Sequence, residues 1–507
     1  MLSSLHEIAS IFMGIEFSYE NEASKCKNVL LVGNGFDLAL GQKTKYSDFL
    51  LYLILIYSVY IALDEPDELD IKKINIEDIE KGFESYPDLN FFLEIFKVRI
   101  SKSPLKKEYI SNLLEENRFT NHFLSMLLQE ELHNSDALTE EVSLGHIGCF
   151  NATKHYIDEL FYDSNAESQN KIIKIGFVLD KFKKIYESDQ SSALSINGWL
   201  DVERFIEYLV LKESDVLQNK FYPTSLFRVN KGFLGNLRGA DIKNDSSIAR
   251  IYYNYLQIFT EEFCKYLTSQ FDYIKSKNDI TFFVEDEIYR ESLSHVKYNY
   301  LQNLIFSSRN GFTNLLRDGI KGIDFIHQIN AIIDFNYSLT TRILEKTITE
   351  ETDFEEKPLL GEYVGITKVN GSCQNDGYGS TAIFGYTRKE NKINSSDLNI
   401  EAFKFEKQTQ RILKGVKRLD IEKIEKGGFN LIIFGFSCAP ADADVLKPLL
   451  TSSELKVAVV LCHTENEMLS IYKNLTDILG EQNINHLLRQ TKDFSQRLFL
   501  VVNRTTS

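Results

Sequence analysis

The sequence predicts an α/β protein whose parallel β-sheet is assembled from the N- and C-terminal segments, with a large, mostly helical insertion between them. Two observations lead to this prediction. Short apolar runs followed by helix-like segments occur once near the N-terminus and recur after residue 325. Between them lies a long stretch whose apolar residues return every three or four positions. Strands that alternate with helices are typical of parallel sheets with helices on both faces.

The first expected strand is Asn28–Gly33, a short run rich in β-branched residues and ended by glycine. A helical region is expected to follow through Leu63. Its most apolar part, Phe49–Leu63, has 15 residues and is bounded by Asp48 and Asp64. A helix that spans a membrane needs about 20 apolar residues. We therefore expect a buried helix here and no membrane partner.

The insertion is expected to begin at a polar stretch, Asp64–Asp88, which contains two of the seven prolines. We place the boundary beside it, which gives a discontinuous core of residues 25–64 and 325–507 and an insertion of residues 65–324. Amphipathic spacing at Ala249–Lys277 predicts a long helix within the insertion. The many tyrosines and phenylalanines of this part are expected to pack between helices.

Four more strands are expected after the insertion, each an apolar run with a helix-like segment behind it or the chain end close by. They are Asn330–Tyr337, Asn430–Ser437, Lys456–His463 and Arg497–Asn503.

Composition limits the function. The 507 residues carry 57 basic and 73 acidic side chains, for a net charge of −16. That balance argues against broad binding of nucleic acid, which requires a basic surface, although it leaves a local basic groove open. The six cysteines are scattered without a CxxC pair, so neither a metal site nor a disulfide framework is expected. Without a signal-peptide pattern at the start, a cytoplasmic location is the expectation.

Ligands of parallel α/β sheets bind outside the carboxyl ends of the strands. The residues that follow the expected strands are therefore the candidate site. They are Gly33, Asn34, Gly35, Phe36 and Asp37 after the first strand, Asn336 and Tyr337 after the second, Gly435, Ser437 and Asp444 after the third, and His463 after the fourth.

Each of these candidates has a functional and a structural interpretation. Gly33 and Gly35 allow close backbone approach, so that N–H groups at a helix start face a phosphate, but tight strand-to-helix turns also need glycine without a ligand. Asp37 either holds a ribose hydroxyl or caps the helix. Asn336 either caps the next helix or holds a ribose or a water. His463 is either an ordinary residue at a strand end or a general base.

A further stretch, Ile383–Arg388, has two interpretations as well. Its arginine is suited to pairing with a phosphate. A buried strand and turn is the interpretation that we favour.

In this order, the motifs resemble the AbiH family of bacteriophage abortive infection proteins. The resemblance is carried by Leu30–Leu50, by Gly198–Phe205 with Trp199 and Glu203, by Ile332–Ser338, and by Phe434–Leu446. The matches extend from residue 28 to about residue 446 and are thinly spread. Where the family usually shows His-Gly, this chain has Asn370-Gly371.

The resemblance implies a Rossmann-like core that is distantly similar to sirtuins, with NAD or a related nucleotide as ligand or substrate. In sirtuin-like defence proteins, NAD is hydrolysed at the nicotinamide–ribose bond. The glycine turn would then hold the pyrophosphate, with Gly371 and Tyr337 nearby. Asn336 would orient water or ribose hydroxyls, while Asp37, Asn370 and His463 complete the catalytic candidates. Asparagine cannot serve as a base, so Asn370 weakens the hydrolase hypothesis.

Three hypotheses therefore stay open: an enzyme that depletes a nucleotide, a catalytically silent nucleotide sensor, and a toxin that acts through a partner. The expected partners are a nucleotide, a phage-derived trigger and a second copy of the chain.

Overall fold

The computed structural model of the chain describes residues 26–39, 42–117, 119–120, 157–158, 160–161, 171–188, 195–196, 199–200, 202–211, 245–276, 329–338, 341, 365–373, 380–387, 400–462, 464–488 and 497–502. The chain divides into two compact units. We call Met1–Gln42, Asn278–Ser372 and Gly415–Ser507 the sheet unit, and Lys43–Lys277 with Cys373–Lys414 the helical unit. Helix α3 (Tyr46–Ala62) and residues 373–414 thus group with the helices, beyond the boundaries at 64 and 325 that the sequence suggests.

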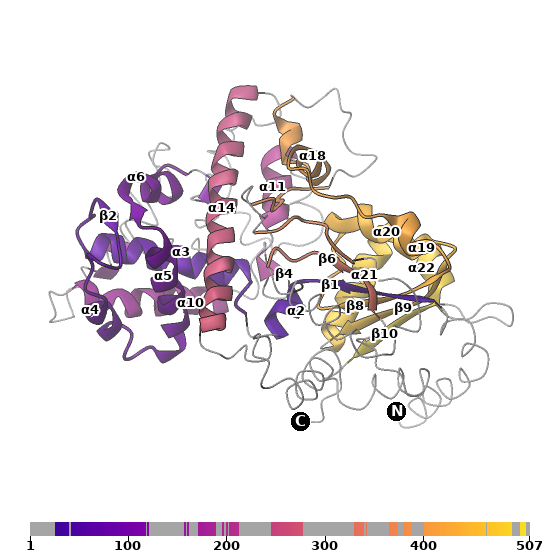
Figure 1. The fold of residues 1–507 in the computed structure, drawn as a ribbon, viewed down its shortest axis with the longest axis horizontal. Helices are drawn as coiled ribbons and strands as arrows, with labels where there is room; N and C mark the ends of the chain where they lie inside the picture. The colour runs from indigo at the N-terminus through magenta and orange to yellow at the C-terminus, as the bar shows by residue number, and fades with distance from the viewer. Residues whose placement is uncertain are drawn as a thin grey trace, which may run out of the picture. The chain divides into compact units, whose positions relative to one another are not determined.

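The sheet unit contains a six-stranded parallel sheet. As the sequence predicts, this sheet is built from both ends of the chain (Figure 1). Its strands are β1 (Lys27–Val32), β6 (Ile329–Asp334), β7 (Gly365–Lys368), β8 (Phe429–Phe434), β9 (Leu455–Cys462) and β10 (Leu498–Val502). Their order across the sheet is β10-β9-β8-β1-β6-β7, and every neighbouring pair is parallel. The N-terminal strand therefore lies at the centre, between strands of the C-terminal half.

The sheet is buried on both faces, which explains why its strands read as continuous apolar runs. Along β1, Val29 and Leu31 belong to one large core cluster, while Leu30 and Val32 point to the opposite face and are equally inaccessible to solvent. Burying each such side chain contributes about 1.5–3 kcal/mol. The cluster that contains Val29 and Leu31 is completed by apolar residues of α19 (Ile421–Glu425), α20 (Ala443–Thr451), α21 (Glu465–Leu479) and α22 (Glu481–Leu488).

Strand β7 is the strand that the sequence does not predict. It has only four residues, begins with a glycine and contains a lysine, so it lacks the apolar run by which the others are recognised. The strand β6 ends at Asp334, three residues earlier than expected, because Phe335 and the residues after it turn away from the ladder.

The helical unit contains the helices α3, α4 (Ile76–Lys81), α5 (Asn90–Lys102), α6 (Lys107–Ile110), α10 (Ile175–Ser188), α11 (Val202–Leu211), α14 (Ser246–Ser276) and α18 (Lys407–Leu413). Two short antiparallel pairs join β2 (Glu68–Leu69) to β3 (Leu105–Lys106) and β4 (Ser195–Ile196) to β5 (Trp199–Leu200). The long helix α14 confirms the expectation for Ala249–Lys277.

Helix α3 is buried along almost its whole length, from Phe49 to Ala62. It packs against α5, α10 and α14 of the same unit. None of the helices in the described part of the chain combines the length and the apolar character that a bilayer-spanning helix needs.

The helical unit also encloses a fully bonded ion pair. The guanidinium of Arg99 on α5 donates two hydrogen bonds, of 3.1 and 3.2 Å, to the carboxylate of Glu262 on α14. The hydroxyls of Tyr52 and Tyr109 donate to the same carboxylate at 3.3 and 2.7 Å. Because every charge is paired, this network connects four helices, α3, α5, α6 and α14, without leaving a charge uncompensated.

Candidate functional site

The carboxyl ends of the central strands bring the sequence motifs to one edge of the sheet. In register, Val32 of β1 pairs with Asp334 of β6 on one side and with Phe434 of β8 on the other. Asp334 pairs in turn with Lys368 of β7. The residues that follow these strands therefore start at the same level, and we call this region the carboxyl edge.

The turn after β1 lies against the turn after β8. The main-chain N–H of Gly33 donates to the oxygen of Phe434 at 3.1 Å, and that of Gly35 donates to the oxygen of Gly435 at 2.7 Å. A Cβ on Gly33 would stand 2.6 Å from the ring of Phe436, and a Cβ on Gly35 would stand 2.5 Å from the Cα of Gly435. Both glycines are thus required by close backbone approach, and both of their N–H groups are already hydrogen-bonded within the protein.

Asn336 ties the turn after β6 to the turn after β1. Its side-chain N–H donates to the oxygen of Gly33 at 2.9 Å, and its main-chain N–H donates to Oδ1 of Asp334 at 2.8 Å. The residue is buried. The main-chain N–H of Phe335 extends the connection by donating to Val32 at 3.0 Å.

Asp334 is a site residue that the sequence analysis does not single out. Its side chain is inaccessible to solvent, and its Oδ2 lies 2.5 Å from Nζ of Lys368. The hydroxyl of Thr341 donates to the same oxygen, while Lys368 also donates to the main-chain oxygens of Asn336 and Ser338. This buried ion pair holds the loop that carries Asn336. An acidic residue at the end of an apolar run was the signal in the sequence.

Asn370 lies in the next turn and has one polar atom without a partner. Its side-chain N–H donates to the oxygen of Phe335 at 3.2 Å. Its Oδ1 is buried and accepts no hydrogen bond from any of the described residues. Gly371 follows with φ +76°, the left-handed conformation that glycine adopts without strain. The side-chain amide of Asn370 is therefore held through its N–H group, while its side-chain oxygen has no hydrogen-bond donor among the described residues.

Aromatic rings and thiols complete the carboxyl edge. The rings of Phe335 and Phe436 are 4.2 Å apart between centroids and both are buried. Burial raises the pKa of the Cys438 thiol far above its usual range, and burial together with Glu467 raises that of Cys462 to about 12. Neither thiol is ionised at neutral pH, so neither is activated as a nucleophile.

The other expected site residues differ in their placement. Asp37 is almost completely buried on α2 (Asn34–Ala39), where it follows the glycine turn, whereas Ser437 and Asp444 are exposed. Asn34 and Tyr337 are partly buried. His463 and the side chain of Phe36 lie outside the described residues.

The two remaining stretches of the sequence analysis belong to the helical unit. Glu203 forms an ion pair of 2.8 Å with the buried Lys407, while nothing is described of the side chain of Trp199. Residues 382–386 are buried, and the side-chain amide of Gln410 bonds both the N–H and the oxygen of Phe384. This supports the interpretation of a buried segment, while Arg388 lies outside the described residues.

Comparison with known proteins identifies the family. No curated protein matches the chain. A family model described as "Bacteriophage abortive infection AbiH" matches residues 29–463, which is far more than half of the sequence and includes the first strand and the loops of the carboxyl edge. The chain therefore belongs to the AbiH family of bacteriophage abortive infection proteins.

Proposed function

We propose that this chain acts in anti-phage defence through a nucleotide site at the carboxyl edge, with NAD or a related nucleotide as the ligand. Membership of the AbiH family supports the defence role. The order of the strands in the sheet supports a nucleotide as the ligand. Numbered along the chain within the sheet, the strands follow the order 6-5-4-1-2-3, which is that of dinucleotide-binding Rossmann sheets read from the other side.

The observation that carries the proposal is the unsatisfied Oδ1 of Asn370. A buried acceptor without a donor costs about 1–3 kcal/mol. A ribose hydroxyl or a carboxamide N–H supplies the missing donor. The Asn336 loop, which lies one strand away, is held rigidly by Asp334 and Lys368 and would orient the same ligand.

The glycine turn has a smaller part in this proposal than the sequence suggests. Since the N–H groups of Gly33 and Gly35 donate to Phe434 and Gly435, they are not free to hold a pyrophosphate. In this proposal the turns shape the edge, and the amides of Asn336 and Asn370 recognise the ligand.

Hydrolysis at the nicotinamide–ribose bond is the first form of the proposed activity. The reaction needs an oriented ribose, stabilisation of positive charge at its carbon, and a base near a water or hydroxyl. Asn336 and Asn370 would orient the hydroxyls. Asp334 is neutralised by Lys368, and the thiols stay protonated, so Asp37 and His463 are the candidates for the base.

The second form of the proposal is a nucleotide sensor that binds the ligand without catalysing a reaction. Asn370 favours it, because an amide stands where family members usually have a histidine. A positioned base contributes about 10²–10⁴ in rate, and an amide cannot supply that contribution.

Incubating the full chain with NAD separates these forms. Released nicotinamide is measured together with the shift in melting temperature that NAD or ADP-ribose produces. A thermal shift with nicotinamide release supports the hydrolase, and a thermal shift alone supports the sensor. In the second case Asn370→His, which keeps an N–H donor toward Phe335 and adds a basic nitrogen, is expected to gain nicotinamide release. Neither shift nor release, with or without phage lysate, contradicts the proposal.

A further inference from the structure

The turn that follows β8 at the carboxyl edge has its main-chain oxygens bonded within the protein. We call residues 435–438 the β8 turn. The oxygen of Gly435 accepts from the turn after β1, as described above. The oxygen of Phe436 accepts from the thiol of Cys438 at 3.8 Å. The oxygen of Ser437 accepts from the side-chain amide of Asn474 on α21 at 2.9 Å.

The N–H groups of the same turn are in the opposite state. No described residue accepts a hydrogen bond from the main-chain N–H of Phe436, Ser437 or Cys438. Phe436 and Cys438 are buried, whereas Ser437 is exposed. Buried main-chain N–H groups without a partner are rare in proteins. The β8 turn therefore offers consecutive donors that the described protein does not use, and it is open to solvent at Ser437.

The shape of the β8 turn is fixed and strained. Cys438 has φ +52°, a left-handed conformation that is unfavourable for a residue with a Cβ, and Gly435 has φ +60°. The bond from Asn474 and the stacking of Phe436 on Phe335 hold this shape. Strain that is held in place in this way occurs preferentially at functional sites. Consecutive N–H groups in such a turn form a concavity for negative charge or for a polar acceptor.

Negative charges beside the β8 turn decide between these two kinds of ligand group. Burial raises the pKa of the Cys438 thiol, and three neighbours raise it further, namely Cys462, Asp442 and Glu467. After burial, Glu467 also raises the pKa of the Cys462 thiol. Two carboxylates thus act on this part of the edge, and they repel a phosphate or a carboxylate of a ligand. The surroundings favour an uncharged acceptor.

A primary carboxamide meets these conditions. Its oxygen has two lone pairs and accepts from two N–H groups of the turn, while its NH₂ group is attracted by the nearby carboxylates. A ring nitrogen of adenine has one lone pair and accepts one hydrogen bond. A carboxamide therefore uses more of the available donors than an adenine ring does.

The β8 turn is distant from the amide of Asn370. Strands β1 and β6 separate β8 from β7, so that three strand spacings, roughly 14 Å, lie between the two ends. One carboxamide does not reach both places. A carboxamide at the β8 turn leaves a ribose hydroxyl as the donor for Asn370.

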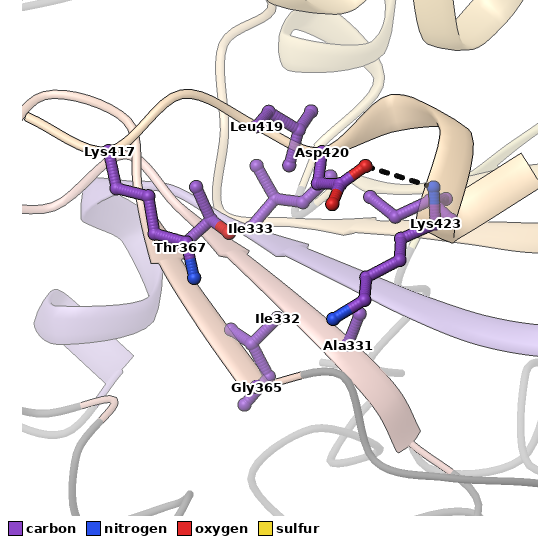
Figure 2. Close-up of a pocket in the computed structure, with 10 residues that line it drawn as sticks. Ala331, Ile332, Ile333, Gly365, Thr367, Lys417, Leu419, Asp420 and Lys423 are labelled. Atoms are coloured by element: carbon purple, nitrogen blue, oxygen red, sulfur yellow. Dashed lines mark hydrogen bonds between the residues drawn. The ribbon is translucent and has the colours of Figure 1, made fainter.

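A small cavity beside β6 and β7 does not compete for this group. It has a volume of about 30 Å³ and lies between the segment 417–424 and these strands. Figure 2 shows Lys417 and Lys423 reaching from that segment toward the strands, with Asp420 turned to its hydrogen bond with the main chain of Lys423. A cavity of this size has room for one or two waters, so it does not hold a nicotinamide ring.

We propose that the β8 turn binds the carboxamide of a nicotinamide ring through its main-chain N–H groups and so selects NAD over its carboxylate analogue. This inference rests on the nucleotide site proposed above. It adds main-chain donors to the amides of Asn336 and Asn370. It also gives the ligand a direction, with the nicotinamide at β8 and ribose hydroxyls toward β6 and β7.

Titration calorimetry of the full chain with NAD and with nicotinic acid adenine dinucleotide tests the proposal. The second compound carries a carboxylate in place of the carboxamide. We expect it to bind at least about tenfold more weakly, because like charges that meet in a site repel.

The variant Glu467→Gln removes one of the two carboxylates and is expected to narrow this preference at least about threefold. The control is Asp477→Asn, an exposed aspartate later on α21, which is expected to keep the preference of the unchanged protein. Circular dichroism checks that each variant is folded. If Glu467→Gln does not fold, Asp442→Asn is used in its place.

Equal affinity for the two dinucleotides overturns this inference and leaves the nucleotide site standing, whereas absence of NAD binding overturns both. A preference that Glu467→Gln leaves unchanged overturns the inference as well. So does a preference that disappears in Asn370→Ala, because the carboxamide then lies at Asn370. A preference that survives in Asn370→Ala and narrows in Glu467→Gln supports it.

Discussion

The side-chain amide of Asn336 donates a hydrogen bond to the main-chain oxygen of Gly33, 303 positions earlier in the chain, at 2.9 Å. This bond joins two of the four motifs that carry the family resemblance and places them at one edge of a parallel sheet. It also gives Asn336 a structural role in addition to the ligand contact that we propose.

Replacing Asn336 is therefore expected to affect stability as well as ligand binding. Asn336→Ala leaves the oxygen of Gly33 buried without its donor, which predicts a loss of about 1–3 kcal/mol in the free energy of unfolding. Urea denaturation measures this loss, with Asn483→Ala on α22 as the matched control. An unchanged free energy of unfolding for Asn336→Ala would show that the bond to Gly33 contributes nothing.

The pair of Asp334 and Lys368 offers a second test. Asp334→Ala removes the partner of a buried ammonium and is expected to cost about 3–5 kcal/mol. Lys368→Met combined with Asp334→Leu removes both charges and is expected to recover part of that loss. A double-mutant cycle by chemical denaturation gives the coupling energy. A coupling close to zero would contradict the role of this pair in holding the Asn336 loop.

The turns after β1 and β8 lie so close together that adding a methyl group at Gly35 is expected to destabilise the protein. Gly35→Ala places a Cβ 2.5 Å from the Cα of Gly435, a backbone atom that has no rotamer by which to move away. We expect a loss of about 1–3 kcal/mol, seen as a lower denaturation midpoint. If the variant were as stable as the unchanged protein, the packing of these turns would be wrong.

Lys414 in the helical unit predicts a dependence of stability on pH. Its ammonium is largely buried and donates to the oxygen of Ala382, and burial lowers its pKa from 10.5 to about 8. The unfolded chain therefore binds more protons than the folded chain between these two values, so stability contributed by this group rises with pH from about 8 to 10.5.

Melting temperatures across this range, compared between the unchanged protein and Lys414→Met, isolate the contribution. We expect the difference between the two proteins to shift in favour of the lysine as pH rises. A difference that stays constant with pH would contradict the lowered pKa.

Much of the fold is predictable from the sequence because parallel strands buried on both faces read as apolar runs. β1, β6, β8, β9 and β10 are recognised in this way. β7 is not, because four residues that include glycine and lysine carry no periodic signal. Its place in the sheet comes from pairing with β6, which depends on contacts distant in sequence.

The candidate site is predictable in position and less so in detail. Gly33, Gly35, Asn336, Asn370 and Gly435 meet at one edge because they follow parallel strands. For Asp334 the sequence offers one signal, an acidic residue at the end of an apolar run, but it shows neither the lysine partner of this aspartate nor its burial. The use of the glycine N–H groups by Phe434 and Gly435 was equally hidden, because it depends on how two turns pack.

The central claim is tested most directly by titration calorimetry, in which NAD is titrated into the unchanged protein and into variants of Asn370 and Asn483. We predict that the unchanged protein and Asn483→Ala bind NAD with the same affinity. Asn370→Ala, which removes the buried acceptor, is predicted to bind about tenfold or more weakly while remaining folded. Equal affinity of all three proteins, or no binding by any of them, would contradict the claim that a nucleotide satisfies Asn370 at the carboxyl edge.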